Sequence, residues 1–281
     1  MSRVAIVVDS ASDLPPEVAA EQGIRIVPLE VSFGDEHFKA LLELSADAFW
    51  RRMLAPDAPF PTTAAASPGE FQAAFEDLFD GGADSIVCVT ISADLSGTYK
   101  SAKVAAAMMG DREIHVIDSR TASMGFGMLA QMAADRAAAG ATGADVARYV
   151  EARKADVDLY VALDTLEYLK RGGRISGARA AMGTVLAIKP IVTVIDGLVD
   201  SADRVRTRAK ARERTLELLT SRPLERATIL HSTGADADEF REVFAARSGL
   251  DASRIQTMVI GPSVGAHVGP GAVGATVVLR R

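Results

Sequence analysis

The sequence lacks several features that would point to particular classes of protein. Its only cysteine, Cys88, cannot form an intrachain disulfide, and it lies in the apolar run Ser85–Ile91, where a small buried core residue is expected. No apolar run reaches the roughly 20 residues that span a membrane. The apolar start of the chain breaks at Asp9, before a signal-peptide core would be complete. These absences predict a cytoplasmic protein with no integral membrane segment.

Familiar catalytic and metal-binding signatures are also missing. The sequence has no Gly-x-Ser-x-Gly elbow, no Walker loop and no His-Glu-x-x-His motif. Its histidines lack metal-ligand spacing, so no metal site is expected. The net charge of -6 repels phosphate backbones, and we expect no nucleic-acid partner despite a basic cluster at Arg204–Arg214.

Two sets of short apolar runs rich in β-branched residues predict an α/β fold with parallel or mixed sheets flanked by helices. With 281 residues, the chain has the length of two domains, and we expect these at residues 1–155 and 156–281. The predicted strands are 4–8, 24–31, 86–91, 114–117, 159–163, 191–195, 228–231, 257–260 and 276–279. The predicted helices are 15–22, 45–54, 67–79, 97–109, 125–139, 145–154, 166–170, 208–220 and 237–247.

Two segments favour other functions. Asp9 and Asp13 follow the first predicted strand, where α/β proteins place ligand loops, so a phosphotransferase or hydrolase using the cleft between the domains is the alternative function. An Asx-type turn explains the same residues as structural, with no catalytic role. Gly125 and Gly127 match a dinucleotide fingerprint, but the preceding turn is too long, and close helix packing explains them better.

Four polar loops are harder to explain as scaffold alone. They bring hydroxyls, an imidazole, cationic groups and glycines that permit close backbone approach to places where a loop meets a ligand. These loops are residues 61–63, 92–99, 169–177 and 261–271.

These loops belong to a set of motifs that resembles the DegV family of bacterial proteins over nearly the whole chain. Seven motifs occur in the family's order, at residues 9–14, 61–71, 92–99, 168–176, 189–191, 205–208 and 267–271. The resemblance implies a two-domain DegV-like fold that holds one long-chain fatty acid between its domains. It also implies a lipid-binding carrier with no cofactor, rather than an enzyme.

The resemblance assigns roles to individual residues. It implies that the hydroxyls of Thr63 and Ser96 bind the fatty-acid carboxylate, with His267 and Arg174 nearby and Thr62 as a possible addition. It further implies that a separate ATP-dependent fatty acid kinase phosphorylates the bound carboxylate, which feeds phospholipid metabolism. The remaining candidate, Arg206, matches a family arginine within the basic cluster. A solvated face is the default interpretation of this cluster, and a surface that meets the kinase or phosphate is the functional alternative.

Overall fold

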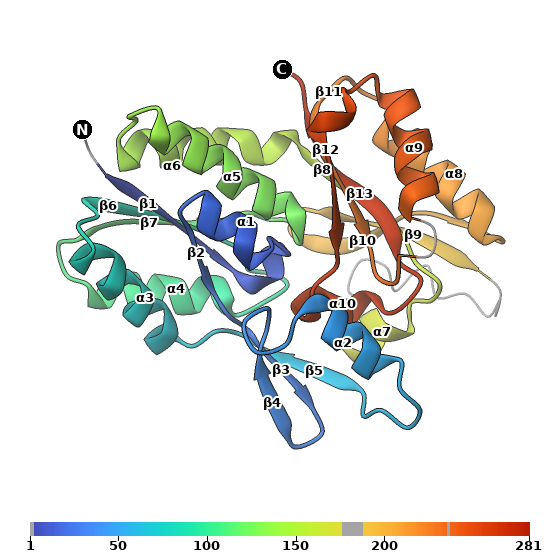
Figure 1. Ribbon diagram of the computed structural model, residues 1–281, viewed down its shortest axis with the longest axis horizontal. Helices are drawn as coiled ribbons and strands as arrows, with labels where there is room; N and C mark the ends of the chain where they lie inside the picture. Colours follow the sequence, from blue (N-terminus) through green and yellow to red (C-terminus); the bar gives the residue numbers. More distant parts are fainter. Residues whose placement is uncertain (1–2, 176–187, 235–236) are drawn as a thin grey trace.

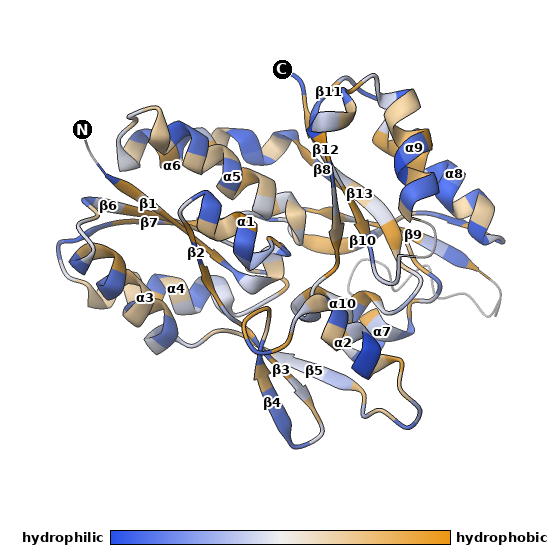
Figure 2. Cartoon of the chain, in the orientation of Figure 1, coloured by the Kyte–Doolittle hydropathy of each residue, from blue (hydrophilic) through white to orange (hydrophobic). Residues whose placement is uncertain are grey.

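The first half of the chain is built on a four-stranded parallel sheet (Figure 1). The computed structural model describes residues 3–175, 188–234 and 237–281. The strands are ordered β2 (Ile24–Val27), β1 (Val4–Asp9), β6 (Ser85–Thr90) and β7 (Glu113–Asp118). Helices cover both faces, so the central strands β1 and β6 are apolar except at their ends (Figure 2). The predicted α/β class is confirmed.

Five helices accompany this sheet: α1 (Pro16–Glu21), α3 (Pro68–Asp80), α4 (Thr98–Met108), α5 (Met124–Ala138) and α6 (Gly143–Arg153). In Figure 1, α5 and α6 lie on one face, and α3 and α4 lie on the other. The start of α3 follows from a capping box, because Ser67 accepts the N–H of Glu70 while the Glu70 carboxylate accepts the N–H of Ser67.

The glycines of α5 serve close packing. A Cβ on Gly127 would lie 2.8 Å from the carbonyl oxygen of Ser12, in the short 3-10 helix η1 (Ser10–Ser12) that follows β1. A Cβ on Gly125 would lie 2.6 Å from the hydroxyl of Thr121. Both distances are shorter than side chains tolerate, so helix packing accounts for these glycines.

A small antiparallel sheet extends from the first half. Its order is β4 (Glu36–Lys39), β3 (Glu30–Phe33) and β5 (Pro61–Ala64), and helix α2 (Ala46–Met53) follows β4. The prediction of one strand over 24–31 is wrong, because the chain leaves the parallel sheet at Pro28, which has no N–H to donate. β5 was expected as a loop, since four residues containing a proline and two polar threonines show no strand signature.

The second half contains a six-stranded mixed sheet, ordered β10-β9-β8-β13-β11-β12. The strands are β8 (Val157–Ala162), β9 (Lys189–Ile195), β10 (Leu198–Val205), β11 (Leu224–His231), β12 (Ile255–Val259) and β13 (Val273–Leu279). The sequence did not predict β10, because an edge strand carries charged residues that hide its period.

Alternate residues of this sheet enter two different cores. Helices α8 (Arg208–Leu219) and α9 (Ala237–Ser248) pack on one face, over Ala162, Ile191 and Ile229. Their neighbours Val161, Val192 and Leu230 belong to the core shared with the first half. Because side chains alternate along a strand, one face of the six-stranded sheet packs toward the parallel sheet of the first half.

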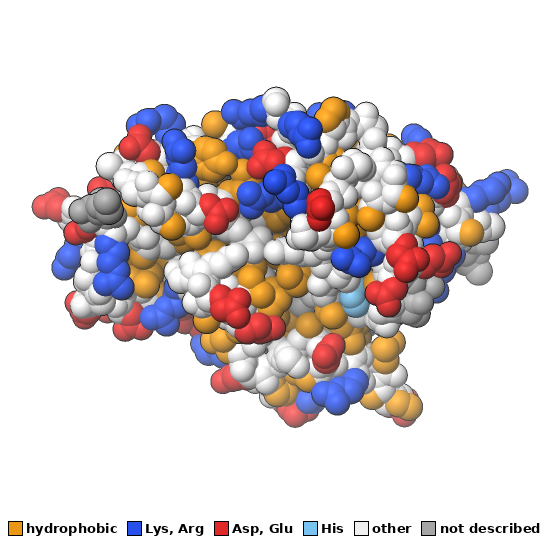
Figure 3. Space-filling view, turned by 45° about the horizontal axis from the view of Figure 1, so that its top comes forward, with side chains coloured by type: hydrophobic (Ala, Val, Ile, Leu, Met, Phe, Trp, Pro, Cys, Tyr) orange, Lys and Arg blue, Asp and Glu red, His pale blue; other side chains and the backbone are white. Residues whose placement is uncertain are grey.

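On the face shown in Figure 3, acidic and basic side chains are interspersed.

The turn between β12 and helix α10 (Pro262–Val268) is fixed to the first half by side chains. A carboxylate oxygen of Asp13 accepts the N–H of Gly261 at 2.9 Å, and the indole N–H of Trp50 donates to the carbonyl of Ile260 at 2.8 Å. The hydroxyls of Ser10 and Ser263 lie 3.0 Å apart. Residues 261–271 are predicted as a loop, but they begin with helix α10, whose start is fixed by hydrogen bonds from Asp13, Trp50 and Ser10 of the first half.

Asp9 and Asp13 are buried, and neither has a cationic partner among the described residues. Asp9 accepts the N–H groups of Ala11 and Ile91, and Asp13 accepts the hydroxyl of Ser123 in addition to Gly261. Burial raises the pKa of both carboxyls to about 7, although the hydrogen bonds oppose the shift. Because their folded pKa values exceed the unfolded value, the native state binds more protons between about pH 4 and pH 7, and its stability falls as the pH rises through this window.

We expect Asp13→Asn to remove the part of this pH dependence that Asp13 contributes. The asparagine oxygen still accepts the N–H of Gly261, and its NH₂ donates to the Ser123 hydroxyl once that group turns. The difference in melting temperature, variant minus wild type, should increase as the pH is raised from about 4 to about 7. Thermal unfolding at several pH values measures it. The exposed Asp80→Asn should follow the wild-type profile, and a constant difference for Asp13→Asn would contradict the raised pKa.

Candidate functional site

A cavity of about 820 Å³, including its open mouth, lies between the two large sheets. Most of the lining is aliphatic. The apolar lining residues are Ala11, Leu29, Ile91, Leu95, Ala122, Leu159, Val161, Leu169, Val192, Val194, Val199, Leu230, Ile260, Val264 and Val268.

The wall formed by the second half follows from strand register. Val161 on β8 pairs with Val192 on β9, and Val194 on β9 pairs with Val199 on β10, so all four valines are on the same face of the sheet. This face belongs to the core shared with the first half, while the opposite face packs under α8 and α9. The alternation provides an aliphatic wall with no aromatic residue among its lining side chains in the described part of the chain.

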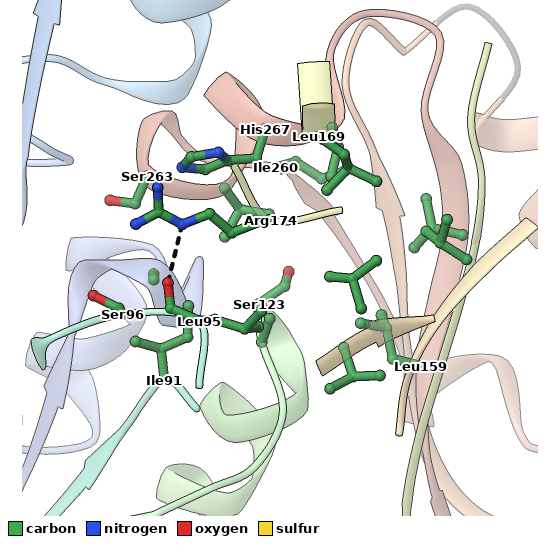
Figure 4. A pocket seen from close by; sticks show the side chains of 18 of the residues that line it. Ile91, Leu95, Ser96, Ser123, Leu159, Leu169, Arg174, Ile260, Ser263 and His267 are labelled. Carbon is green, nitrogen blue, oxygen red and sulfur yellow. Dashed lines mark hydrogen bonds between the residues drawn. The ribbon is translucent and has the colours of Figure 1, made fainter. Parts of the chain in front are cut away.

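Polar side chains gather at one end of the cavity. Figure 4 shows His267, Arg174, Ser96 and Ser263 on one side of the view, while Leu159 and further aliphatic side chains lie on the other. Thr63 lines the cavity as well. The cavity therefore has a polar end and an aliphatic end. Four of the six residues named from the sequence, Thr63, Ser96, Arg174 and His267, line this one cavity.

Thr63 and His267 interact across the halves of the chain. Thr63 lies on β5 opposite Val31, and its hydroxyl oxygen is 2.9 Å from Nε2 of His267 on α10. The neighbouring Thr62 pairs with Ser32 on the alternate position of the strand, is exposed, and does not line the cavity. Because successive side chains of a strand point to opposite faces, Thr63 faces the cavity and Thr62 faces away from it.

Ser96 lies just before α4. Its Oγ is 2.8 Å from Oγ1 of Thr98 and accepts the N–H of Thr98 at 3.3 Å, which orients the hydroxyl at the start of the helix. Ser92, in the same loop, turns the other way and donates to the carbonyl of Gly197 at 2.7 Å, so it joins this loop to the β9–β10 turn.

Arg174 supplies the cationic charge. Its Nε donates to the carbonyl of Leu95 at 3.0 Å (dashed in Figure 4), and Nη1 donates to the carbonyl of Gly172 at 2.6 Å. Helix α7 (Glu167–Arg171) leads into this loop, whose predicted continuation at Ser176 and Gly177 lies outside the described residues. Gly172 approaches His267 so closely that a Cβ would lie 2.0 Å from Nδ1 of the ring.

The electrostatics of the polar end favour an anion. Burial, and secondarily the charge of Arg174, lower the pKa of His267 to about 4, so the imidazole is neutral at physiological pH. Its Nδ1 is buried and has no hydrogen-bond partner among the described residues. The polar end therefore combines the guanidinium of Arg174 with neutral hydroxyls and a neutral imidazole.

The other candidates lie elsewhere. Arg206 is exposed in the bend between β10 and α8 and does not line the cavity. Asp9 and Asp13 are inside the core, bonded to backbone N–H groups. Sequence reasoning missed Ser123 and Ser263 as lining residues. Ser263 falls within the loop predicted at 261–271, whereas nothing marks Ser123 beyond its place before a helix.

The described ranges hold neither a metal-binding cluster nor a membrane-spanning helix. Residues 3–175, 188–234 and 237–281 contain no cluster of three histidine, cysteine or acidic side chains suited to a metal ion. Within those ranges no helix is both long and apolar enough to cross a membrane.

Known proteins resemble this chain over its whole length. It is 34% identical to a DegV domain-containing protein of Caldanaerobacter subterraneus subsp. tengcongensis, covering 98% of each chain. Its fold matches a DegV family protein from Thermus thermophilus described by its fatty acid binding, with TM-score 0.91, 33% identity and coverage of 99% and 100%. A stearic-acid-binding protein from Eubacterium ventriosum matches with TM-score 0.88, 25% identity and coverage of 99% and 98%.

The family model described as "Uncharacterised protein, DegV family" matches residues 3–280. The ordered motifs, the fold and this match agree over the same span. The chain therefore belongs to the DegV family.

Proposed function

We propose that this protein binds one long-chain fatty acid, with the tail along the aliphatic walls and the carboxylate at the polar end. The observation that carries the proposal is that one cavity has both an aliphatic end and a polar end that holds Arg174. The fatty-acid-binding proteins from Thermus thermophilus and Eubacterium ventriosum, which share this fold, support it. In this proposal the domains are residues 1–155 and 156–281, and the ligand lies between them.

The tail supplies most of the affinity. Each buried methylene contributes roughly 0.8 kcal/mol, so a tail of about fifteen contributes on the order of 12 kcal/mol before association and ordering costs. The aliphatic lining offers no hydrogen bond that would select a particular position along the chain. The polar end therefore decides that the ligand is an acid and which way it lies.

The carboxylate receives its hydrogen bonds from neutral groups beside one cation. When Nε2–H of His267 donates to Thr63, the threonine keeps its own proton for the carboxylate. Ser96 donates from the opposite side of the polar end, and Arg174 supplies the charge. Each such bond to a charged acceptor contributes about 1.5–3 kcal/mol.

The second part of the proposal concerns what happens to the acid. The protein acts as a carrier and not as the enzyme: a separate fatty acid kinase phosphorylates the bound carboxylate, and the product feeds phospholipid metabolism. Arg206, exposed before α8, is the proposed contact for the kinase. The family resemblance supports this part. The test measures acyl phosphate formed by such a kinase from a fatty acid with and without this protein. We expect product only when the protein is present, and less product with the Arg206→Glu variant than with the wild type.

Protein purified from bacteria should release about one equivalent of a C14–C18 fatty acid on denaturation, because a ligand with this much buried tail survives purification. Mass spectrometry of the extracted lipid measures it. Delipidated protein should take up palmitate or oleate again. Finding neither a bound acid nor uptake would overturn the proposed function.

Replacing Thr63 and Ser96 by alanine should weaken fatty-acid binding by roughly tenfold to a hundredfold for each hydroxyl, because each removes a hydrogen bond to a charged group. Competition with a fluorescent fatty acid gives the dissociation constants. Thr62→Ala is the matched control, since its side chain is exposed on the same strand and lies outside the cavity. Equal affinities for all the variants would refute the assigned carboxylate position.

Gly172→Ala should weaken binding by at least roughly tenfold through His267. The backbone at Gly172 (φ -74°) suits alanine, but the new Cβ would lie 2.0 Å from Nδ1 of His267, so the ring must turn away from Thr63. Imidazole NMR signals report the movement, and fatty-acid titration reports the loss. In Gly69→Ala the new Cβ meets only the Ser67 hydroxyl at 3.9 Å, so both readouts should match the wild type.

A further inference from the structure

A second cavity lies on another side of α5 and shares no lining residue with the first. Its volume is about 970 Å³ including the open mouth, and it is formed between α5, the end of α1 and the starts of β11 and β12. The lining is polar apart from Met128 and Ala227. The polar lining residues are Gln22, Gln131, Asp135, Glu225, Arg226, Ser253, Arg254 and Gln256.

The floor of this cavity contains a buried carboxamide. Gln131 is only 5% exposed, and its side chain makes no hydrogen bond to any residue in the described part of the chain. Buried side-chain amides in folded proteins are almost always hydrogen-bonded. Gln131 therefore needs a partner inside the cavity, either water or a ligand.

Charged groups at the wall keep only some of their donors and acceptors available. Oε2 of Glu225 accepts from Nη2 of the buried Arg153 at 2.6 Å, so only its Oε1 faces a ligand without a hydrogen bond. Nη1 of Arg226 is 3.7 Å from Oδ2 of Asp135, and Nε is 3.9 Å from Oε1 of Glu225. Both distances are too long for hydrogen bonds. Arg254 has no hydrogen bond or ion pair from its side chain to the described residues.

The balance of these groups limits the ligand. Two arginines and two acidic residues line the cavity, and Arg153 compensates the charge of Glu225 from behind the wall. A multiply charged anion such as a phosphate ester would therefore be repelled mainly by Asp135. A molecule with one carboxylate and one ammonium group satisfies both signs, since guanidinium binds carboxylate and the acidic pair accepts N–H donors. Gln131 and Gln256 can then both donate to and accept from the remaining polar atoms.

We propose that this second cavity is a binding site for a small polar zwitterion of the amino-acid class. Arg226 and Arg254 hold the carboxylate, Asp135 and the remaining Oε1 of Glu225 hold the ammonium group, and Gln131 closes the buried end. The site stands apart from the fatty-acid cavity, and no residue lines both.

The test uses the full-length protein and the standard L-amino acids at millimolar concentration. Saturation-transfer NMR identifies which of them binds, and calorimetry then compares that amino acid with the matching amine, the matching carboxylic acid and inorganic phosphate. We expect each half-molecule and phosphate to bind at least tenfold more weakly than the amino acid.

Variants localise the binding. Gln131→Leu keeps the side-chain volume and removes the amide, and Arg226→Gln removes one cation, so each should weaken binding at least tenfold. Arg148→Gln, at an exposed position on α6, is the matched control and should bind like the wild type. Fatty-acid content should be unchanged in all three, which separates this test from that of the proposed function.

Two results would overturn the proposal. Phosphate that binds more tightly than every amino acid would mark a simple anion site. Missing amino-acid signals would mean that water fills the cavity. Signals that persist unchanged in Gln131→Leu would mean that the amino acid binds elsewhere on the protein.

Discussion

The contact on which the functional end of the molecule depends is the one that Asp13 makes with Gly261 and Ser123. One carboxylate oxygen accepts the N–H of Gly261, and the other accepts the hydroxyl of Ser123 at 2.5 Å. A Cβ at Gly261 would lie 2.8 Å from that carboxylate, so only glycine permits the approach. Because Gly261 precedes α10, Asp13 determines where the helix carrying His267 begins. The two acidic residues that resemble catalytic groups in the sequence therefore organise the fold.

The same contact holds a strained residue at the cavity wall. Ser123 has φ 54° and ψ -149°, a conformation that costs a residue with a side chain on the order of 1–3 kcal/mol. The short hydrogen bond to Asp13 offsets part of this cost, and it uses an oxygen that would otherwise be a buried acceptor without a partner. Asp13 itself is at φ 55°, where aspartate is better tolerated than most residues. Strain and hydrogen bond together explain why η1, α5 and α10 meet at this point.

How far the sequence predicts this molecule depends on how local each signal is. The strands of the parallel sheet were found from apolar runs, and α3 from its capping box, because both signals lie within a few residues. β5 and β10 were missed, since a short polar strand and a charged edge strand have no such period. Thr63, Ser96, Arg174 and His267 were located through motifs, whereas their meeting in one cavity depends on contacts between residues up to 204 positions apart.

The chemistry of the polar end suits a ligand that must be held and still remain available. Arg174 already spends two donors on the carbonyls of Leu95 and Gly172, which fixes the guanidinium and limits how many donors it can turn to a carboxylate. His267 is neutral because burial and Arg174 lower its pKa to about 4. A second cation there would bind the acid more tightly, but it would also withdraw charge from the carboxylate oxygens and make them poorer nucleophiles. In the proposed function the tail supplies most of the binding free energy, so a weakly charged polar end can orient the carboxylate and leave it reactive toward the proposed partner.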